Sequence, residues 1–317
     1  MIYIFIFVLL LLIEFLYIKL AVKFKIVDKP NSRSSHNNVT ILGGGIIFFI
    51  SILIYCIIYG FQYPWFFVSL TLLTSVSFID DLKPQSFRLR LLVQIIAILL
   101  MFHELGVLDL QWYFIVPAII IAPGILNAYN FMDGINGMIS LTSLVVLTSL
   151  LYIDHFIIDF ADVNMIVFSL LSLIVFAFFN VRNKAKCFAG DVGAISMAFI
   201  VLFLLTKLIL KTENFIWLGL LSVFGVEVVL TMIHRIILKE NLSVAHRKHL
   251  FQLMVNELKM PHLKVSAIYA IIQLIISIGL IAFNGAFAIA FFVIEIIVLS
   301  VIYYSFIKKY FQLHISK

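Results

Sequence analysis

Charge is scarce in this chain of 317 residues: Asp, Glu, Lys and Arg make up 12%, whereas soluble domains carry roughly 25%. Hydrophobic residues make up 64% and the mean hydropathy is +1.18, which together exclude a soluble domain. The two cysteines, Cys56 in an apolar run and Cys187 in a polar segment, are too few for a disulfide framework. The first segment, from Met1 to about Val22, has no basic residue before its apolar run and no convincing cleavage site, so we expect a retained helix.

Apolar runs of about 20 residues recur along the whole chain, and each is long enough to cross a bilayer as a helix. No internal repeat, low-complexity segment or second domain stands out. The sequence therefore predicts an all-α, polytopic membrane protein with one membrane-embedded domain over residues 1–317. Eleven spans are predicted, at 1–22, 41–59, 64–79, 91–105, 113–127, 138–153, 163–180, 194–210, 214–238, 265–283 and 286–306.

The basic residues predict the orientation. With the N-terminus outside and the C-terminus cytoplasmic, all 22 Lys and Arg residues except Lys207 and Lys211 fall on the cytoplasmic side. Cytoplasmic loops are typically rich in Lys and Arg, which supports this arrangement. The net charge of +6 is therefore explained by topology and not by a nucleic-acid partner. The predicted cytoplasmic loops are 23–40, 80–90, 128–137, 181–193 and 239–264, followed by the tail after residue 306.

Five polar clusters interrupt the apolar pattern, and the predicted topology brings all of them to the cytoplasmic face. This one-sided distribution indicates a single site. The clusters are Asp28 to His36 with Gly43-Gly44-Gly45; Asp80-Asp81; Asn127-Ala-Tyr-Asn130-Phe-Met-Asp133-Gly-Ile-Asn136-Gly137; Phe188-Ala-Gly190-Asp191-Val-Gly193; and His246-Arg247-Lys248-His249-Leu-Phe-Gln252.

The acidic clusters favour a hard cation. Asp80 and Asp81 are adjacent at a membrane boundary, where two carboxylates repel each other unless a cation compensates them. Mg²⁺ takes oxygen ligands and is usually held by one or two carboxylates plus substrate phosphates. Asp191 precedes a span, where it could hold such a metal or could simply cap the helix. A solvated acidic pair that caps a loop remains the alternative for Asp80 and Asp81.

The remaining clusters offer polar contacts. Asp133 and Asn136 are three residues apart, so they share a face if a helix starts there, and helix capping is the alternative. His246 and His249 share a face in the same way, and Arg247 can bind phosphate oxygens. The alternative for this cluster is a basic patch on anionic lipid. The glycine triplet suggests close packing or a substrate contact. The intramembrane carboxylates Glu14, Glu227 and Glu295 are interpreted as packing or pairing residues away from the site.

Carboxylates that face basic residues at a lipid–cytosol boundary suit two anionic substrates, one a lipid and one water-soluble. Transfer between such anions needs charge neutralisation and positioning above all. In this order, the clusters resemble the polyprenyl-phosphate N-acetylhexosamine-1-phosphate transferases, also called glycosyltransferase family 4, over roughly residues 28–252.

The resemblance implies a phosphotransferase for substituted phosphate groups, of class 2.7.8, in the bacterial cytoplasmic membrane. Its expected partners are a UDP-sugar and undecaprenyl phosphate, with Mg²⁺ as cofactor and Mn²⁺ as an alternative. It would release UMP at the first membrane step of a cell-envelope glycan. A homodimer is an open alternative to a monomer.

The family's functional residues can be carried over to matching positions. Asp191 would be the main Mg²⁺ ligand, with Asp133 beside it. Asp80 and Asp81 would act near the lipid phosphate, with Asp80 deprotonating it for direct attack on the phosphorus attached to the sugar. The expected catalytic residues are Asp80, Asp81, Asp133 and His249, and the expected substrate-binding residues are Asn127, Asn130, Asn136, His246, Arg247, Arg33 and His36.

Three departures from the family pattern bear on the substrate. Asn136 stands where many members have a second aspartate, and Val39-Thr-Ile-Leu-Gly43 lacks the proline that often precedes the glycines. The run from His246 to His249 differs from the three histidines of the phospho-N-acetylmuramoyl-pentapeptide transferase. It is closer to enzymes that start O-antigen, lipopolysaccharide or capsule chains, so we expect a UDP-N-acetylhexosamine, or a deoxy or amino variant. The pentapeptide transferase, another membrane Mg²⁺ enzyme and a transporter remain the alternatives.

Overall fold

The computed structural model describes residues 1–28, 39–241 and 246–315, with side chains described as far as residue 309. Arg33 and His36 lie outside the described residues. Within these ranges the chain is almost entirely helical, and the prediction of an all-α fold is confirmed. The elements are α1 (Ile2–Phe24), β1 (Val27–Asp28), β2 (Thr40–Ile41), α2 (Ile46–Tyr59), α3 (Pro64–Leu82), α4 (Phe87–Glu104), η1 (Val107–Asp109), α5 (Trp112–Met132), α6 (Met138–Phe156), α7 (Val163–Asn180), α8 (Gly190–Thr212), η2 (Phe215–Leu221), α9 (Ser222–Ile237), α10 (Leu250–Asn256), α11 (His262–Ala282) and α12 (Gly285–Ile315).

Each of the eleven predicted spans occurs as helix, and nine segments of the described chain are long and apolar enough to cross a membrane. The other two are α2 and α4. α2 has 14 residues and so rises only about 21 Å. α4 has 18 residues but carries Arg88, Arg90 and Gln94 in its first half, which lowers its hydropathy. A multi-pass membrane protein follows from the remaining nine.

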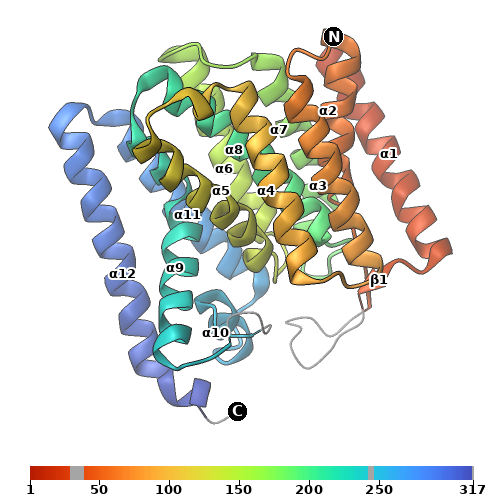
Figure 1. Cartoon of the computed structure of the whole chain (residues 1–317). Coiled ribbons are helices and arrows are strands. Elements are labelled where there is room, and N and C mark those ends of the chain that lie inside the picture. Colours follow the sequence, from red (N-terminus) through yellow and green to blue (C-terminus); the bar gives the residue numbers. More distant parts are fainter. Residues whose placement is uncertain (29–38, 242–245, 316–317) are drawn as a thin grey trace.

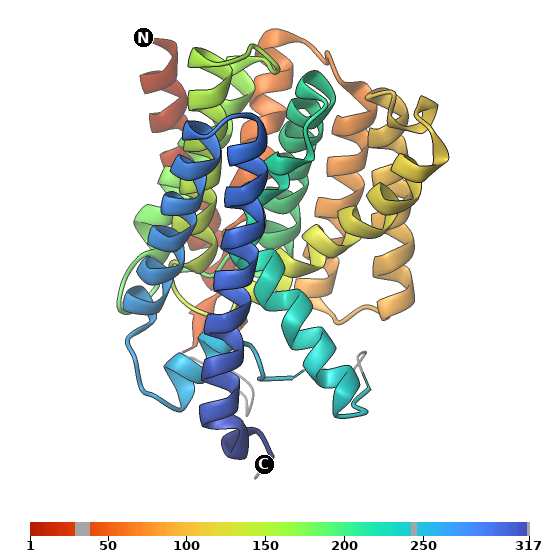
Figure 2. The same cartoon turned by 90° about the vertical axis from the view of Figure 1, so that its left-hand side faces the viewer.

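The helices form one bundle around α8 (Figures 1 and 2). α8 packs against α3, α5 and α2, and nearly all its side chains from Gly190 to Leu205 are buried. A helix that is apolar on every face is stable only inside such a bundle or in lipid. α12 lies at the outside against α9 and leaves most of its apolar side chains exposed, as expected for a helix that faces lipid.

The polar clusters come together at one end of the bundle, which we call the polar end. It carries β1, α10 and the C-terminal end of the chain, whereas the N-terminus lies at the opposite end (Figure 1). β1 and β2 pair antiparallel there, with Val27 opposite Ile41 and Asp28 opposite Thr40. The one-sided arrangement predicted from the sequence is therefore present, and which side of the membrane the polar end faces remains a prediction.

The glycine triplet packs closely against the start of α8. The N–H groups of Gly44 and Gly45 donate to the carbonyls of Phe188 and Ala189, at 2.9 and 3.1 Å. A Cβ on Gly45 would lie 2.2 Å from Cα of Gly193, so α2 and α8 meet at a distance that admits no side chain on either. The expected close packing is thus what these glycines provide, and it fixes the segment that carries Asp191.

The predicted span 214–238 is not one continuous α-helix. It consists of the 3-10 helix η2 followed by α9, which leans away from the bundle axis toward the polar end (Figure 2). At the junction, Gln273 of α11 accepts a hydrogen bond from Val223 N at 3.2 Å and donates one to the Gly219 carbonyl at 3.1 Å. A break at membrane depth needs such partners because lipid offers none. The polar residue that permits this break is 50 positions away, so the apolar pattern of 214–238 did not predict it.

Candidate functional site

A carboxylate cluster, defined here as Asp80, Asp81, Asp133 and Asp191, occupies the polar end. Asp80 and Asp81 are in the last turn of α3, Asp191 is in the first turn of α8, and Asp133 follows α5. Arg90 in the first turn of α4 bridges two of them: its Nη1 is 2.8 Å from Oδ2 of Asp80 and 3.2 Å from Oδ2 of Asp191. The Arg90 bridge therefore ties three helices, α3, α4 and α8, together at one point.

Asp81 stabilises the start of α8. Its Oδ1 and Oδ2 accept hydrogen bonds from the backbone N–H groups of Asp191 and Val192, at 2.9 and 3.1 Å. Gly190 permits this contact, since its φ is +72° and a Cβ there would lie 2.5 Å from Oδ2 of Asp81. Both oxygens of Asp81 are thus engaged with α8, and Asp81 determines where Asp191 lies.

Asp191 does not cap its own helix. The N-cap position of α8 is Ala189, and the capping interactions come from Asp81, so the alternative of Asp191 as an N-cap residue is wrong. Its side chain is 32% exposed, compared with 8% for Asp80, and it contacts Arg90 and the Asn130 side chain. Asp191 is therefore the more exposed of the two carboxylates that Arg90 bridges, and it also shares a hydrogen bond with Asp80.

Asp133 and Asn136 lie in the turn between α5 and α6, so the expectation that they share a helical face is wrong. Asp133 accepts a hydrogen bond from Gly190 N–H and faces Asp191. Burial and then the charge of Asp191 raise the pKa of Asp133 to about 7. The Asn136 amide instead donates to the carbonyls of Arg182 and Asn183, at 2.8 and 3.3 Å. Asn136 thus closes the turn, and its side chain is not brought into the carboxylate cluster.

Asn127 and Asn130 line a small pocket of about 20 Å³ together with Asp191 and Arg90. The Asn127 amide donates to Oε1 of Gln94 at 3.0 Å and to the Pro123 carbonyl at 2.8 Å. The same pocket has apolar walls from α3, α4 and α8. Its lining residues are Leu73, Val76, Ser77, Arg90, Val93, Gln94, Asn127, Asn130, Asp191 and Ile195.

The histidines predicted to share a helical face are not helical, because residues 246–249 have no regular secondary structure and precede α10. Their rings are nevertheless adjacent, with centroids 4.9 Å apart, and both rings pack on Phe131 of α5. Phe131 is next to Asn130 and two residues before Asp133. The histidine loop therefore borders the carboxylate cluster. Arg247 is half-buried in the same loop.

Both histidines are neutral at physiological pH. Burial and then the positive charge of Arg235 lower the pKa of His246 to about 4. Burial, the neighbouring His246 and Arg235 lower the pKa of His249 to about 3. Lys248 pairs with Glu240. As neutral rings, the histidines each carry one hydrogen-bond donor and one acceptor. Positive charge in this loop comes from Arg247 and Lys248.

Sequence reasoning missed three residues of the site. Arg90 was counted only as a loop cation and Gln94 was not noticed, although the two are four residues apart at the start of one helix and so share a face. Glu227 was assigned away from the site, but its Oε1 is 3.8 Å from Nδ1 of His249 and accepts a hydrogen bond from Phe251 N at 3.3 Å. An acidic residue about three turns before the end of a span was the available signal.

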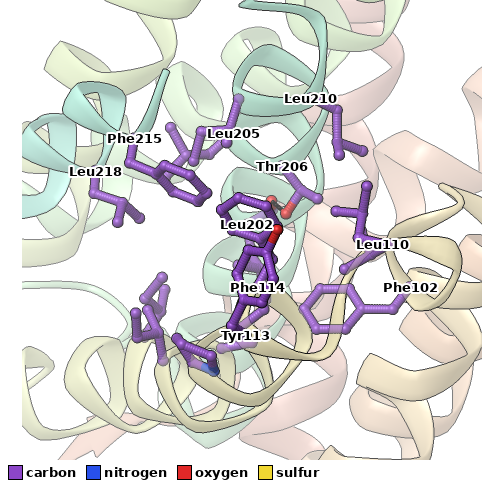
Figure 3. Close-up of a pocket in the computed structure, with 17 residues that line it drawn as sticks. Phe102, Leu110, Tyr113, Phe114, Leu202, Leu205, Thr206, Leu210, Phe215 and Leu218 are labelled. Atoms are coloured by element: carbon purple, nitrogen blue, oxygen red, sulfur yellow. Dashed lines mark hydrogen bonds between the residues drawn. The ribbon is translucent and has the colours of Figure 1, made fainter. Parts of the chain in front are cut away.

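A second, apolar pocket of about 310 Å³ lies between the far halves of α4, α5 and α8 and the segments η1 and η2 (Figure 3). Phe102, Tyr113, Phe114, Leu202 and Leu218 surround it, and Thr206 adds a hydroxyl. α4, α5 and α8 also form the small polar pocket described above. One group of helices therefore presents polar groups at the polar end and apolar space farther along.

Within the described residues, no group of three or more His, Cys, Asp or Glu side chains forms a ready metal site. The bundle and its cluster nonetheless define a class: a multi-pass membrane protein with an acidic site at one end. Comparison with protein-family models matches residues 63–209 to glycosyl transferase family 4. The matched stretch covers α3 to α8 and so includes the whole carboxylate cluster. The match spans somewhat less than half of the chain and is a likeness to that family over the segment that carries the carboxylate cluster. No curated protein matches the chain.

Proposed function

We propose that this protein transfers a sugar 1-phosphate from a UDP-sugar to a polyprenyl phosphate and releases UMP. The observation that carries the proposal is Asp191. It is a carboxylate in the first turn of a buried helix, it has been relieved of capping by Asp81, and it is more exposed than Asp80. A carboxylate held in this way is preorganised for a ligand, and α8 does not need it as a cap.

The carboxylate oxygens of Asp133 and Asp191 are ligands of the kind that Mg²⁺ prefers. Asp191 and Asp133 are close enough for the charge of one to raise the pKa of the other, and a hard cation between them would relieve that repulsion. Asp191 and Asp133 are the residues that would hold it. When bound, Mg²⁺ supplies charge neutralisation for the diphosphate.

The acceptor side is proposed to lie at the small pocket with Arg90, Asn127 and Asn130. The Arg90 guanidinium can bind a lipid phosphate, and Asp80 beside it is the proposed base. The apolar pocket along the same helices suits an isoprenoid chain, which needs continuous apolar contact away from its phosphate. We propose that the phosphate binds near Arg90 and the chain extends toward this pocket.

The donor side is proposed to lie between the carboxylate cluster and the histidine loop. His246, Arg247 and His249 are available for the diphosphate or the sugar, with Phe131 as an apolar surface between them. A UDP-N-acetylhexosamine, or a deoxy or amino variant, is preferred over the peptidoglycan pentapeptide donor because the loop lacks three consecutive histidines. We propose a role at the start of an O-antigen or capsule chain.

The test is UMP formation by the purified protein in detergent with undecaprenyl phosphate and a panel of UDP-sugars, with and without Mg²⁺. We expect UMP only when a matching donor, the lipid and the cation are all present. UMP formation without the lipid would contradict transfer to it. Absence of UMP with every donor, including the pentapeptide precursor, would favour the transporter alternative, because a transporter leaves the donor intact.

A further inference from the structure

Glu227 of α9 connects three elements from inside the bundle. Its carboxylate accepts hydrogen bonds from the Tyr269 hydroxyl of α11 and from Phe251 N–H of α10, the latter at 3.3 Å. Leu250 N–H also donates to it. The side chain is 5% exposed, so water contributes little to its hydrogen bonding. Glu227 therefore fastens the first turn of α10 to α9 and α11.

α10 depends on this attachment. It has seven residues, well below the roughly 12–15 at which isolated helices become marginally stable. The first N–H groups of any helix also lack partners within the helix. Glu227 supplies partners for two of them, the N–H groups of Leu250 and Phe251.

The position of α10 determines the position of His249. His249 immediately precedes α10, is 2% exposed and forms a capping box with Gln252, whose Oε1 accepts a hydrogen bond from His249 N–H at 3.3 Å. Its Nδ1 is 3.8 Å from Glu227, too far for a hydrogen bond. Glu227 thus holds His249 through the backbone of α10, and both imidazole nitrogens are buried beside the region assigned to the donor.

α10 also contacts the turn that carries Asp133. A Cβ on Gly134 would lie 2.8 Å from the Phe251 ring, so the two segments are in tight contact. The Phe131 and His249 rings are 5.8 Å apart. A shift of α10 would therefore displace both the turn that carries Asp133 and the ring of His249, which border the region assigned to the donor.

Helix α9 also holds the histidine loop, residues 246–249 and the segment that leads to them, at a second point. Arg235 donates to Oε2 of Glu240 at 3.1 Å and to the Asn241 carbonyl at 2.7 Å, and Lys248 pairs with Glu240. Glu227 and Arg235 are eight residues apart and so lie on one face of α9. One helix face therefore supports both ends of the loop that carries His246 and His249.

We propose that Glu227 is a positioning residue for the donor: it fixes α10, and through α10 it orients His249 toward the UDP-sugar. The inference rests on the proposed function for its substrate, but the anchoring itself can be measured without any substrate. It assigns to an intramembrane carboxylate a role in donor binding and none in lipid binding.

The experiment compares Glu227→Gln and Tyr269→Phe with Glu295→Gln. Glu295 is a matched control: it is a buried glutamate of the same bundle that accepts a hydrogen bond from Ser222 at the start of α9, and among the described residues no hydrogen bond joins it to α10. Each variant is measured for hydrogen–deuterium exchange of residues 249–256, for KM of the UDP-sugar and for KM of the polyprenyl phosphate.

We expect Glu227→Gln to speed exchange in residues 249–256 and to raise the KM of the UDP-sugar about fivefold or more, with the lipid KM unchanged. Tyr269→Phe should show the same pattern more weakly, and Glu295→Gln should show neither change. Unchanged exchange in Glu227→Gln would overturn the inference, as would an equal rise in both KM values. If the wild-type protein formed no UMP, the proposed function would fail, and the exchange measurement would still decide the anchoring.

Discussion

At the scale of single residues, neighbouring aspartates of the site have different roles: one caps a helix and another is proposed to bind a ligand. Asp81 and Asp191 could each cap α8, and the structure gives that task to Asp81 from another helix. Asp191 is thereby left for a ligand. The sequence predicted that these residues would meet, because all lie at one end of predicted spans. It did not predict which would cap, since that depends on the register of α3 against α8.

Replacing Gly190 with alanine should disrupt the capping of α8 by Asp81. The new Cβ would meet Asp81 at 2.5 Å, and alanine at a φ of +72° costs about 1–2 kcal/mol. We expect Gly190→Ala to lower the thermal unfolding temperature in detergent and to reduce UMP formation. Gly225→Ala is the control, because no described atom lies within 4 Å of its Cβ position. Equal unfolding temperatures for the two variants would show that the Asp81–Gly190 contact is unimportant.

Replacing Arg90 should lower activity with the lipid substrate more than replacing its basic neighbour Arg88. Removal of its guanidinium leaves Asp80 and Asp191 without the cation that bridges them, and removes the proposed contact with the lipid phosphate. We expect Arg90→Gln to lower kcat/KM for the lipid about tenfold or more. Arg88→Gln, two residues earlier on an exposed face, should stay near the wild type. If both variants lost activity equally, a general effect of loop charge would be the better explanation.

At the scale of elements, regular helices were predictable and their interruptions were not. Apolar runs predicted each span because length and hydropathy alone determine which segments cross a bilayer. The break between η2 and α9 depends on Gln273, which is distant in sequence. Asp133 and Asn136 were likewise expected to share the face of a helix start within the predicted loop 128–137, whereas they lie in a turn.

The histidine loop before α10 should make the protein sensitive to acid. Because the folded-state pKa values of His246 and His249 are about 4 and 3, the unfolded chain binds protons first as pH falls below about 6.5. The stability from these neutral histidines is therefore present above pH 6.5 and is lost as pH falls toward 4. Asp133 acts in the opposite sense, because its raised pKa favours the folded state as pH falls below 7.

The difference between the wild type and His249→Gln isolates this contribution. We expect the unfolding temperature in detergent to fall less steeply between pH 6.5 and pH 4.5 in His249→Gln than in the wild type. The slope removed corresponds to at most about 1.4 kcal/mol per pH unit. Parallel pH profiles for the two proteins would mean that His249 is protonated in the folded state at these pH values.

At the scale of the whole molecule, the bundle brings polar segments from most of the chain to one end (Figure 1). This arrangement follows from an alternation that the sequence already contained, in which polar clusters and basic residues occupy every second connection. The sequence could therefore predict that the clusters share one end. The contacts within that end, such as the Arg90 bridge and the attachment of α10 by Glu227, depend on helix packing and were not predictable from spacing.

The orientation of the bundle can be tested with single cysteines, because the native Cys56 and Cys187 are both buried. Lys184 is exposed in the α7–α8 connection at the polar end, and Asp159 is exposed in the α6–α7 connection at the other end. We expect a membrane-impermeant maleimide to label Asp159→Cys in intact cells, and to label Lys184→Cys only after the membrane is opened. The reverse pattern would contradict a cytoplasmic site.

The central claim is that Asp191 binds a ligand of the reaction, and UMP formation by Asp191→Asn tests it most directly. Asp159→Asn, an exposed aspartate at the other end of the bundle, is the control. We predict that Asp191→Asn loses UMP formation by about a hundredfold or more while its unfolding temperature stays close to that of the wild type. Asp159→Asn should keep full activity. Wild-type activity in Asp191→Asn, with the same donor, lipid and Mg²⁺, would contradict the assignment of Asp191 as the ligand-binding carboxylate of this site.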